Sequence, residues 1–282
     1  MTAHGAKYRA FARRAAWHIK LTNPDLPVHI YSDAPIDDPS VDEVTVLDGV
    51  WHRSRLDSML TSPFDETLAL DVDIFVTLPI GDIFDTLAVH DIAACHDQNR
   101  SFARRELDWD MPNAMPQLNG GVVAYRKSDA ALDFIRRWRD HVQETNAERD
   151  QPTFRKLAYE GKARMAILPP EYNLQNRQSF TFRYRNVAPR VMHVIGAGND
   201  EKYLTSRYPV LLFLGPKLYQ EFLEAILRDS YIDETALPPF ARYGQGRAPI
   251  LTRMRLTALY RQLLMTSRFD GGELSDKEFD IL

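Results

Sequence analysis

The feature that most constrains the fold is an alternation of helix-like and strand-like segments along most of the chain. Residues 6–22 carry apolar side chains at helical spacing, and VHIYSD at residues 28–33 has the composition of a strand. Proline and asparagine separate such segments, as they do at Asn23 and Pro24. Helices that alternate with strands are typical of α/β proteins, and we expect that class here.

The same signals predict the remaining elements. Strands are expected at VDEVTVLD, LALDVDIFVTL, DIAACHD, GGVVAYR, ARMAILP and RVMHVIG. Helices are expected at SRLDSMLTS, near residues 83–87, after the capping residue Ser128, at DQPTFRKLAYEG and at KLYQEFLEAILRD. Because the pattern becomes helical from about Tyr203, we predict a core domain at 1–203 and a helical C-terminal extension at 204–282.

Two aspartates interrupt the most apolar of these strands. Asp71 and Asp73 lie two positions apart, and residues i and i+2 of a strand share one face. An ionised carboxylate in apolar surroundings is costly unless it is paired, hydrogen-bonded or bound to a cation. A divalent cation would relieve the repulsion between two such groups. The alternative is that both aspartates are solvated at a strand end or cap the next turn.

His193 is the further ligand that such a cation site suggests. It lies in VMHVIG, an apolar strand that ends at Gly196, where an imidazole can emerge at the strand terminus. On its own, a histidine in this setting is more often a satisfied core or edge residue. Two carboxylates and one imidazole suit an ion that accepts oxygen and nitrogen ligands, and Mn²⁺ fits this set better than Mg²⁺ or Ca²⁺.

Composition excludes several classes of protein. A formal net charge of -4 over 282 residues shows no electrostatic footprint of a nucleic-acid partner. One cysteine, Cys95, excludes an internal disulfide framework and fits a reducing compartment. The N-terminus lacks the apolar core of a signal peptide, and no apolar run is long enough to span a membrane. We therefore expect a cytoplasmic protein.

An ordered series of segments resembles a known family. The segments are PFDETLALDVDIFV, LNGGVVAYRKSDAALDFIRRW, ERDQPTF, LPPEYN and HVIG. In this order they resemble the family 8 glycosyltransferases, the glycogenin and bacterial galactosyltransferase type with a GT-A fold. The resemblance covers roughly residues 6–200. It implies a GT-A-like mixed sheet flanked by helices and an enzyme that uses a nucleotide diphosphate sugar.

The resemblance also implies roles for the charged residues. Asp71, Asp73 and His193 would hold Mn²⁺ against the diphosphate of the donor, where a metal stabilises the charge on the leaving oxygen. Arg55 matches a basic residue near the donor, and its guanidinium suits a phosphate oxygen or a sugar hydroxyl. A solvated helix position is the alternative for Arg55. Asp150 and Gln151 match a pair beside the donor sugar, where they would position it and stabilise an oxocarbenium-like state.

Smaller residues of the series would complete the substrate site. In LNGG, Gly120 and Gly121 would let the backbone approach a ligand, and Asn119 offers a sugar hydroxyl both a donor and an acceptor. A turn that enters the following strand is the alternative. Asn173 in LPPEYN would contact donor or acceptor, although capping a turn explains it equally well.

The sequence departs from the family pattern in two places. The family opens with a strand that helps to form the nucleobase pocket, and we expect this first strand to be absent because the helical pattern starts almost at once. The family also has a lysine shortly after HxxG that meets the diphosphate. Asn199 occupies that offset here, and Lys202 is the nearest lysine.

The stretch from Arg247 to Arg268 interleaves arginines with leucines and other apolar residues. Such a basic amphipathic segment packs on its own domain or on a partner subunit of a homo-oligomer, which is the reading we favour. The alternative is contact with an anionic membrane at its inner face.

Taken together, the sequence predicts transfer of a hexose to an acceptor hydroxyl with retention of configuration, and the resemblance alone implies that the hexose is UDP-linked. The acceptor is a glycan, a lipid-linked sugar or a protein. The alternatives are a Mn²⁺ or Mg²⁺ phosphohydrolase acting on a nucleotide or sugar phosphate, and a non-catalytic sugar-binding relative.

Overall fold

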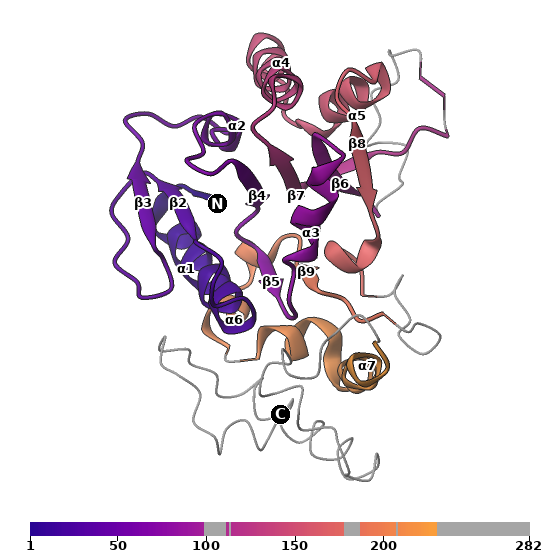
Figure 1. The fold of residues 1–282 in the computed structure, drawn as a ribbon. Helices are drawn as coiled ribbons and strands as arrows, with labels where there is room; N and C mark the ends of the chain where they lie inside the picture. Colours follow the sequence, from indigo (N-terminus) through magenta and orange to yellow (C-terminus); the bar gives the residue numbers. More distant parts are fainter. Residues whose placement is uncertain (99–110, 113, 178–186, 207, 230–282) are drawn as a thin grey trace.

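The computed structural model describes residues 1–98, 111–112, 114–177, 187–206 and 208–229. In this part of the chain the strands form three sheets, and helices pack around them (Figure 1). The α/β class expected from the alternation of segments is therefore confirmed.

The first sheet is parallel and has the order β1-β2-β3. Its strands are β1 (Thr2–Ala3), β2 (His29–Ser32) and β3 (Glu43–Val46). Helix α1 (Gly5–Thr22) connects β1 to β2 and buries Phe11, Ala15 and Ile19 along one side. These positions are spaced by four residues, which places them on one face of the helix.

The second sheet has the order β4-β7-β6-β8. Its strands are β4 (Glu66–Leu70), β7 (Leu118–Arg126), β6 (Ile92–His96) and β8 (Met165–Leu168). Strand β7 pairs antiparallel with both β4 and β6, whereas β6 and β8 are parallel. Every residue of β7 before Arg126 is buried, so this strand is the centre of the sheet.

The third sheet pairs β5 (Ile74–Val76) antiparallel with β9 (Val191–His193). Residues 71–73 connect β4 to β5 and belong to neither strand. We expected one strand through LALDVDIFVTL, and that expectation is wrong. The chain leaves the four-stranded sheet after Leu70 and enters a different sheet at Ile74, so the two aspartates lie at the junction.

Three helices share a hydrophobic cluster with the four-stranded sheet. They are α2 (Arg55–Leu60), α4 (Asp129–Thr145) and α5 (Gln151–Glu160). Their ends follow the sequence signals: the Ser128 hydroxyl accepts a hydrogen bond from the Ala131 N–H at 3.2 Å, and Gly161 ends α5 with φ of 68°. Trp138 of α4 and Phe154 of α5 stack in this cluster with ring centroids 4.3 Å apart.

The remaining helices are short except for the last. They are α3 (Asp82–Asp85), α6 (Lys202–Thr205) and α7 (Pro209–Arg228), with 3₁₀ turns at Thr86–Ala88, Pro170–Tyr172 and Ala197–Asn199. Helix α7 is kinked at Gly215, where φ is 73°, and Pro216 follows the kink.

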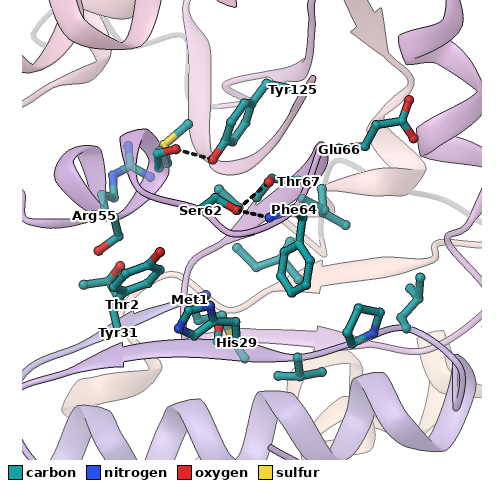
Figure 2. A pocket seen from close by; sticks show the side chains of 18 of the residues that line it. Met1, Thr2, His29, Tyr31, Arg55, Ser62, Phe64, Glu66, Thr67 and Tyr125 are labelled. Carbon is teal, nitrogen blue, oxygen red and sulfur yellow. Dashed lines mark hydrogen bonds between the residues drawn. The ribbon is translucent and has the colours of Figure 1, made fainter. Parts of the chain in front are cut away.

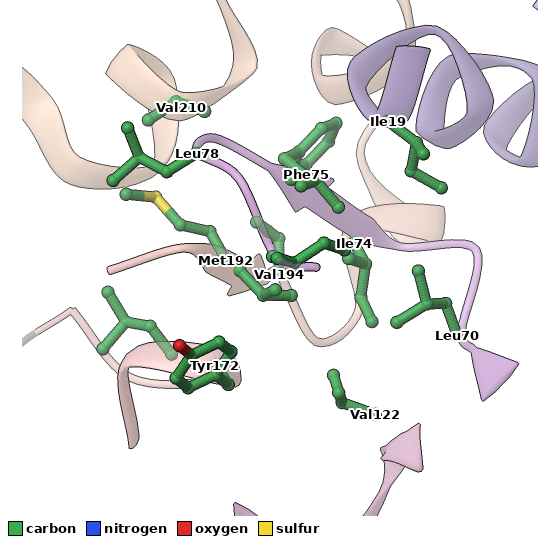
Figure 3. Packing of buried hydrophobic residues seen from close by; sticks show 14 of the residues in the cluster. Ile19, Leu70, Ile74, Phe75, Leu78, Val122, Tyr172, Met192, Val194 and Val210 are labelled. Carbon is green, nitrogen blue, oxygen red and sulfur yellow. The ribbon is translucent and has the colours of Figure 1, made fainter. Parts of the chain in front are cut away.

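A second hydrophobic cluster joins the small sheet to α1 and α7. Figure 3 shows Ile19 of α1 on one side of β5 and Val210 of α7 near Leu78 and Met192. The described part of the segment after residue 203 thus packs on the core. The division into 1–203 and 204–282 stays a prediction, because residues 230–282 lie outside the description.

We expected the opening strand of the family to be absent, and that expectation is wrong: a short strand, β1, is present. Thr2 and Ala3 pair with Tyr31 and Ser32, and the Met1 ammonium donates a hydrogen bond to the His29 carbonyl. A cavity of about 240 Å³ lies beside this pairing, between residues of β2 and residues of β4 (Figure 2). Arg55 and Asp71 contribute to its lining, so the cavity reaches the predicted donor site.

For the basic stretch from Arg247 to Arg268 we predicted packing on the domain or on a partner subunit, with membrane contact as the alternative, and this stretch lies outside the described residues. Among the described helices, none combines the length and the apolar character that crossing a bilayer requires.

Candidate active site

The two predicted metal-binding aspartates are fixed by backbone hydrogen bonds at the junction of two sheets. The Asp71 N–H donates to the Gly121 carbonyl of β7 at 2.9 Å. The Asp73 carbonyl accepts the N–H of Val194, just after β9, at 2.9 Å. Both side chains are partly exposed, with 36% of the Asp71 side chain and 24% of the Asp73 side chain accessible. Each carboxylate is thus anchored at its backbone and reachable from solvent.

His193 is brought to these aspartates by the pairing of β5 with β9. It lies opposite Ile74, the residue that follows Asp73. Its Nε2 atom is 3.3 Å from Asp73 Oδ1 and 3.8 Å from Asp71 Oδ2. The sequence hypothesis required these three side chains to converge from separate segments, and the structure places them together.

The three side chains fit a divalent cation. One ligand atom from each of Asp71, Asp73 and His193 can be chosen so that all lie within 4.8 Å of one another. Two carboxylate oxygens and one imidazole nitrogen form a mixed ligand set that suits a first-row divalent ion. Partial exposure of the two aspartates leaves room for further ligands from a bound substrate.

Electrostatics around His193 reflect the same convergence. Burial alone would lower the pKa of His193, but the hydrogen bond and charge of Asp73, with Asp71 and Asp97, outweigh burial and raise it. The negative charge that raises this pKa is the charge that would attract a cation to the same place. Asp97 follows β6, is buried, and was not singled out from the sequence.

Arg55 links the candidate metal site to a second carboxylate. Its guanidinium donates to Asp150 Oδ2 from Nη2 at 2.5 Å and from Nε at 3.1 Å. Its Nη1 donates to Asp71 Oδ1 at 3.2 Å and to the Gly120 carbonyl at 2.5 Å. Arg55 begins α2 and also lies 5.3 Å from the centre of the Trp138 ring. The Arg55 guanidinium thus forms hydrogen bonds with groups of the candidate site.

Asp150 is a buried carboxylate at the N-terminus of α5. Burial alone would raise its pKa, but Arg55 and Arg53 outweigh burial and hold the pKa below its ordinary value. The Trp138 indole N–H donates to the Asp150 carbonyl at 2.8 Å, which fixes the backbone there. Gln151, the other member of the predicted pair, is the first residue of α5 and is half-buried.

Gly120 and Gly121 make room for side chains of the site itself. A Cβ atom on Gly120 would lie 3.0 Å from Cζ of Arg55, and Nη2 of the same guanidinium would be closer still. A Cβ atom on Gly121 would lie 2.7 Å from Nδ1 of His193. Neither glycine needs an unusual φ. Their lack of a side chain is what allows the guanidinium and the imidazole to lie against β7.

Asn119 and Asn173 lie beneath the candidate metal ligands, and both are buried. Asn119 Oδ1 accepts hydrogen bonds from the Gly121 N–H and from Asn173 Nδ2, each at 2.9 Å. Asn173 Oδ1 is 3.1 Å from His193 Nδ1. The structure therefore joins both predicted asparagines to His193, and their contact with a sugar hydroxyl stays a prediction.

Lys202 contacts Asp200 and Tyr203, which are not among the candidate ligands. Its Nζ is 2.5 Å from Asp200 Oδ2 and lies over the Tyr203 ring. A different lysine reaches the turn after HxxG: Lys7 of α1 has Cε 3.8 Å from where a Cβ on Gly198 would lie. Lys7 could not be singled out from the sequence, because the two segments are distant in the chain and only the fold brings them together.

The sequence was compared with protein-family profiles and with curated proteins. Residues 27–203 match the profile of the nucleotide-diphospho-sugar transferase family. A search of curated proteins found no match.

Solved structures resemble the fold. The galactosyltransferase LgtC, in complex with donor and acceptor sugar analogues, is 14% identical with a TM-score of 0.53; the match covers 83% of this chain and 97% of that one. An active-site mutant of LgtC is 15% identical with a TM-score of 0.50, and the match covers 69% of this chain and 86% of the mutant. The glycosyltransferase GlyE of Streptococcus pneumoniae TIGR4 is 19% identical with a TM-score of 0.48, and the match covers 68% of this chain and 53% of GlyE. This chain thus spans about half the length of GlyE.

The fold and the ordered segments define a GT-A glycosyltransferase of the family 8 type. The chain belongs to the nucleotide-diphospho-sugar transferase family, whose profile matches more than half of its length. The resemblance stated from the sequence is therefore confirmed at the level of family and fold.

Proposed function

We propose that this chain transfers a hexose from a UDP-linked donor to an acceptor hydroxyl, with retention of configuration and with the help of a divalent cation. The observation that carries the proposal is the convergence of Asp71, Asp73 and His193 beside the pair formed by Arg55 and Asp150. In LgtC, a structure with a similar fold, donor and acceptor sugar analogues are bound together.

Asp71, Asp73 and His193 would hold the cation, with Mn²⁺ preferred to Mg²⁺ because of the imidazole ligand. When bound, such an ion supplies Lewis-acid stabilisation to the diphosphate oxygens as negative charge develops on them. The partial exposure of both carboxylates supports this role, because the diphosphate must approach from the solvent side.

Asp150 would face the donor sugar, and Arg55 would hold the Asp150 carboxylate in that position. The lowered pKa of Asp150 keeps its carboxylate charged at neutral pH, so it can stabilise positive charge at the anomeric carbon. Arg55 contacts Asp150 and Asp71 at once, which sets the distance between the sugar side and the metal side of the site. Gln151, next in the chain, is proposed to position the same sugar.

Lys7 is proposed as a contact of the donor diphosphate. Its side chain lies beside Gly198, in the turn that follows the HxxG segment. An ammonium group at this turn would attract phosphate oxygens, as a point charge does in other phosphate sites. Lys202 stays a prediction for the same role.

The proposed reaction exchanges one bond for another at the anomeric carbon. The bond from that carbon to the diphosphate oxygen breaks, and its electron pair leaves with the diphosphate. A bond from the acceptor oxygen forms on the same face, and the hydroxyl proton passes to the departing diphosphate. The class of acceptor, whether glycan, lipid-linked sugar or protein, is left to experiment.

Incubation of the protein with candidate UDP-hexoses tests the proposal. A thermal-shift screen with Mn²⁺ would first identify the donor, because a ligand that binds only the folded state raises the melting temperature. The selected donor is then incubated with and without a panel of acceptors. Transfer to an acceptor supports the proposal. Hydrolysis alone, with every acceptor, would favour a phosphohydrolase, and binding without turnover would favour a non-catalytic relative.

A further inference from the structure

A line of hydrogen bonds runs under the candidate metal site, from the backbone of β7 to the ring of His193. The Gly121 N–H donates to Asn119 Oδ1 at 2.9 Å, and Asn173 Nδ2 donates to the same oxygen at 2.9 Å. Asn173 Oδ1 then meets Nδ1 of His193 at 3.1 Å. Asn119, Asn173 and His193 are almost fully buried, with 2%, 0% and 4% of each residue exposed.

The chemistry of these contacts fixes each amide in turn. A backbone N–H can only donate, so the Asn119 atom that meets Gly121 must be its oxygen. The Asn173 atom that meets this oxygen must then be its nitrogen, which leaves Asn173 Oδ1 towards the imidazole. An amide oxygen can only accept a hydrogen bond, so the His193 nitrogen facing it must carry a proton.

Neighbouring backbone contacts hold this line in place. The His193 N–H donates to the Leu174 carbonyl at 2.9 Å, and the Leu174 N–H donates to the Val191 carbonyl at 2.8 Å. Leu174, the residue after Asn173, is therefore tied to β9 on both sides of Met192, which holds Asn173 close to His193. The ring in turn lies against the bare Cα of Gly121, which limits its rotation.

We propose that Asn119 and Asn173 are positioning residues that keep a proton on Nδ1 of His193, so that Nε2 is the nitrogen presented to the cation. The inference rests on the proposed metal site. Metal-binding histidines commonly donate their second ring N–H to an outer partner, which fixes the ring and strengthens the ligand. In this chain the outer partner is itself oriented, through Asn119, by a backbone N–H.

Rotation of the Asn173 amide by half a turn would reverse this outcome. Its NH₂ group would then face Nδ1, which would have to become the bare nitrogen, and Nε2 would carry the proton. The same rotation would bring Asn173 Oδ1 against Asn119 Oδ1, where two acceptors repel each other. Asn119 thus acts on the His193 ring through Asn173.

Nuclear magnetic resonance of the protein labelled with ¹⁵N-histidine tests the inference. Among the eight histidines, the signals of His193 are assigned by their loss in His193→Gln. Spectra are recorded without metal and with Mg²⁺, which is diamagnetic. We expect a slowly exchanging Nδ1–H in both states and a change at Nε2 alone when the ion binds.

Two variants of Asn119 separate positioning from a merely structural role. Asn119→Leu removes the acceptor that orients Asn173, so we expect fast exchange or loss of the Nδ1–H and Mn²⁺ binding weaker by roughly 10- to 100-fold. Asn119→Asp keeps an acceptor oxygen and should restore the Nδ1–H signal. Asn176→Ala, an exposed asparagine outside the line, should change neither readout.

Three results would overturn the inference: a bare Nδ1 in the wild-type protein, an unchanged ring signal and Mn²⁺ affinity in a folded Asn119→Leu, or Asn119→Asp behaving as Asn119→Leu does. The wild-type spectrum decides even where Asn119→Leu fails to fold. The proposed sugar transfer fails separately, because a chain without transferase activity can still show the Nδ1–H. If the asparagines instead contact sugar, Asn119→Leu raises KM for the donor and leaves the ring signal unchanged.

Discussion

Gly121 lies directly beneath the imidazole of His193, and Gly120 lies beneath the guanidinium of Arg55. Both glycines are on β7, next to Asn119, which orients the amide that meets His193. One short stretch of a central strand therefore seats the predicted metal ligand, the arginine and the buried asparagines. From the sequence, the glycines suggested a close approach of backbone to substrate, whereas in the structure protein side chains occupy that space.

Gly121→Ala should displace the imidazole, because the new Cβ would lie 2.7 Å from Nδ1 and β7 cannot retreat from its two neighbours. We expect Mn²⁺ binding, measured by calorimetry, to weaken by at least about 10-fold. Gly49→Ala is the matched control, since a Cβ there meets nothing within 4 Å. Equal Mn²⁺ affinity in Gly121→Ala and Gly49→Ala would contradict the placement of His193.

Arg55→Lys should reduce transfer although it keeps the charge. An ammonium cannot reproduce the contacts that the guanidinium makes with Asp150, Asp71 and the Gly120 carbonyl. We expect kcat to fall by roughly 10-fold or more, with a smaller change in the KM of the donor. Arg136→Lys, at a position with 52% side-chain exposure, is the control. Wild-type kcat in Arg55→Lys would show that the fork geometry is not needed.

At the scale of elements, the junction between β4 and β5 creates the site. Asp71 is anchored to β7 and Asp73 to the residue just after β9, so the backbones of the two aspartates are held by two different sheets. The spacing of two residues was read from the sequence as two positions on one face of a strand. The convergence was predicted, but its cause is the crossing from one sheet to another.

Much of this arrangement could be predicted because the signals are local. Apolar periodicity, the Ser128 cap and the Gly161 terminus located α1, α4 and α5, and apolar runs located most strands. The break at residues 71–73 was interpreted as an interruption within one strand, since Val72 continues the apolar pattern. Contacts such as Lys7 with Gly198, or Arg55 with Asp150, depend on segments distant in the chain, and a single sequence does not reveal them.

Asp91 forms hydrogen bonds with residues at the ends of several elements, and it should make the free energy of unfolding depend on pH. Burial alone would raise its pKa, but hydrogen bonds from Arg126, the backbone and side chain of Arg164, and Ser128 outweigh burial and lower the pKa well below its usual range. A carboxylate with a lowered folded-state pKa stabilises the fold above its unfolded pKa of about 3.9, and this contribution is lost as the pH falls towards the folded-state pKa.

Asp91→Asn should therefore lower the free energy of unfolding by about 2 kcal/mol at pH 7, because hydrogen bonds to a charged acceptor are lost. Urea denaturation of wild type and variant should show this gap narrowing below about pH 4. Asp133→Asn, with 53% side-chain exposure, serves as the control. A gap of the same size at pH 7 and in acid would contradict the assignment.

At the scale of the whole molecule, β7 is the central strand to which the rest of the site is attached. It pairs with β4 and β6, and it is buried up to Arg126. The β1-β2-β3 sheet is separated from β4 by the cavity of about 240 Å³, and β3 is largely exposed or half-buried. The two parts of the molecule should therefore differ in local stability.

Native-state hydrogen exchange can measure this difference. We expect the amides of Val122, Ala124 and Tyr125 to exchange only by the largest opening of the protein, and those of Glu43–Val46 to exchange through smaller openings. Similar protection of β3 and β7 would show that the sheets unfold as one unit despite the cavity between them.

The central claim is that Asp71, Asp73 and His193 bind one divalent ion, and calorimetric titration of Mn²⁺ into the metal-free protein tests it most directly. Asp48→Asn, an exposed aspartate outside the site, is the control for the loss of one negative charge. We predict one ion per chain for wild type and Asp48→Asn, and no detectable binding for Asp73→Asn. Binding of Mn²⁺ by Asp73→Asn with wild-type affinity would contradict the claim.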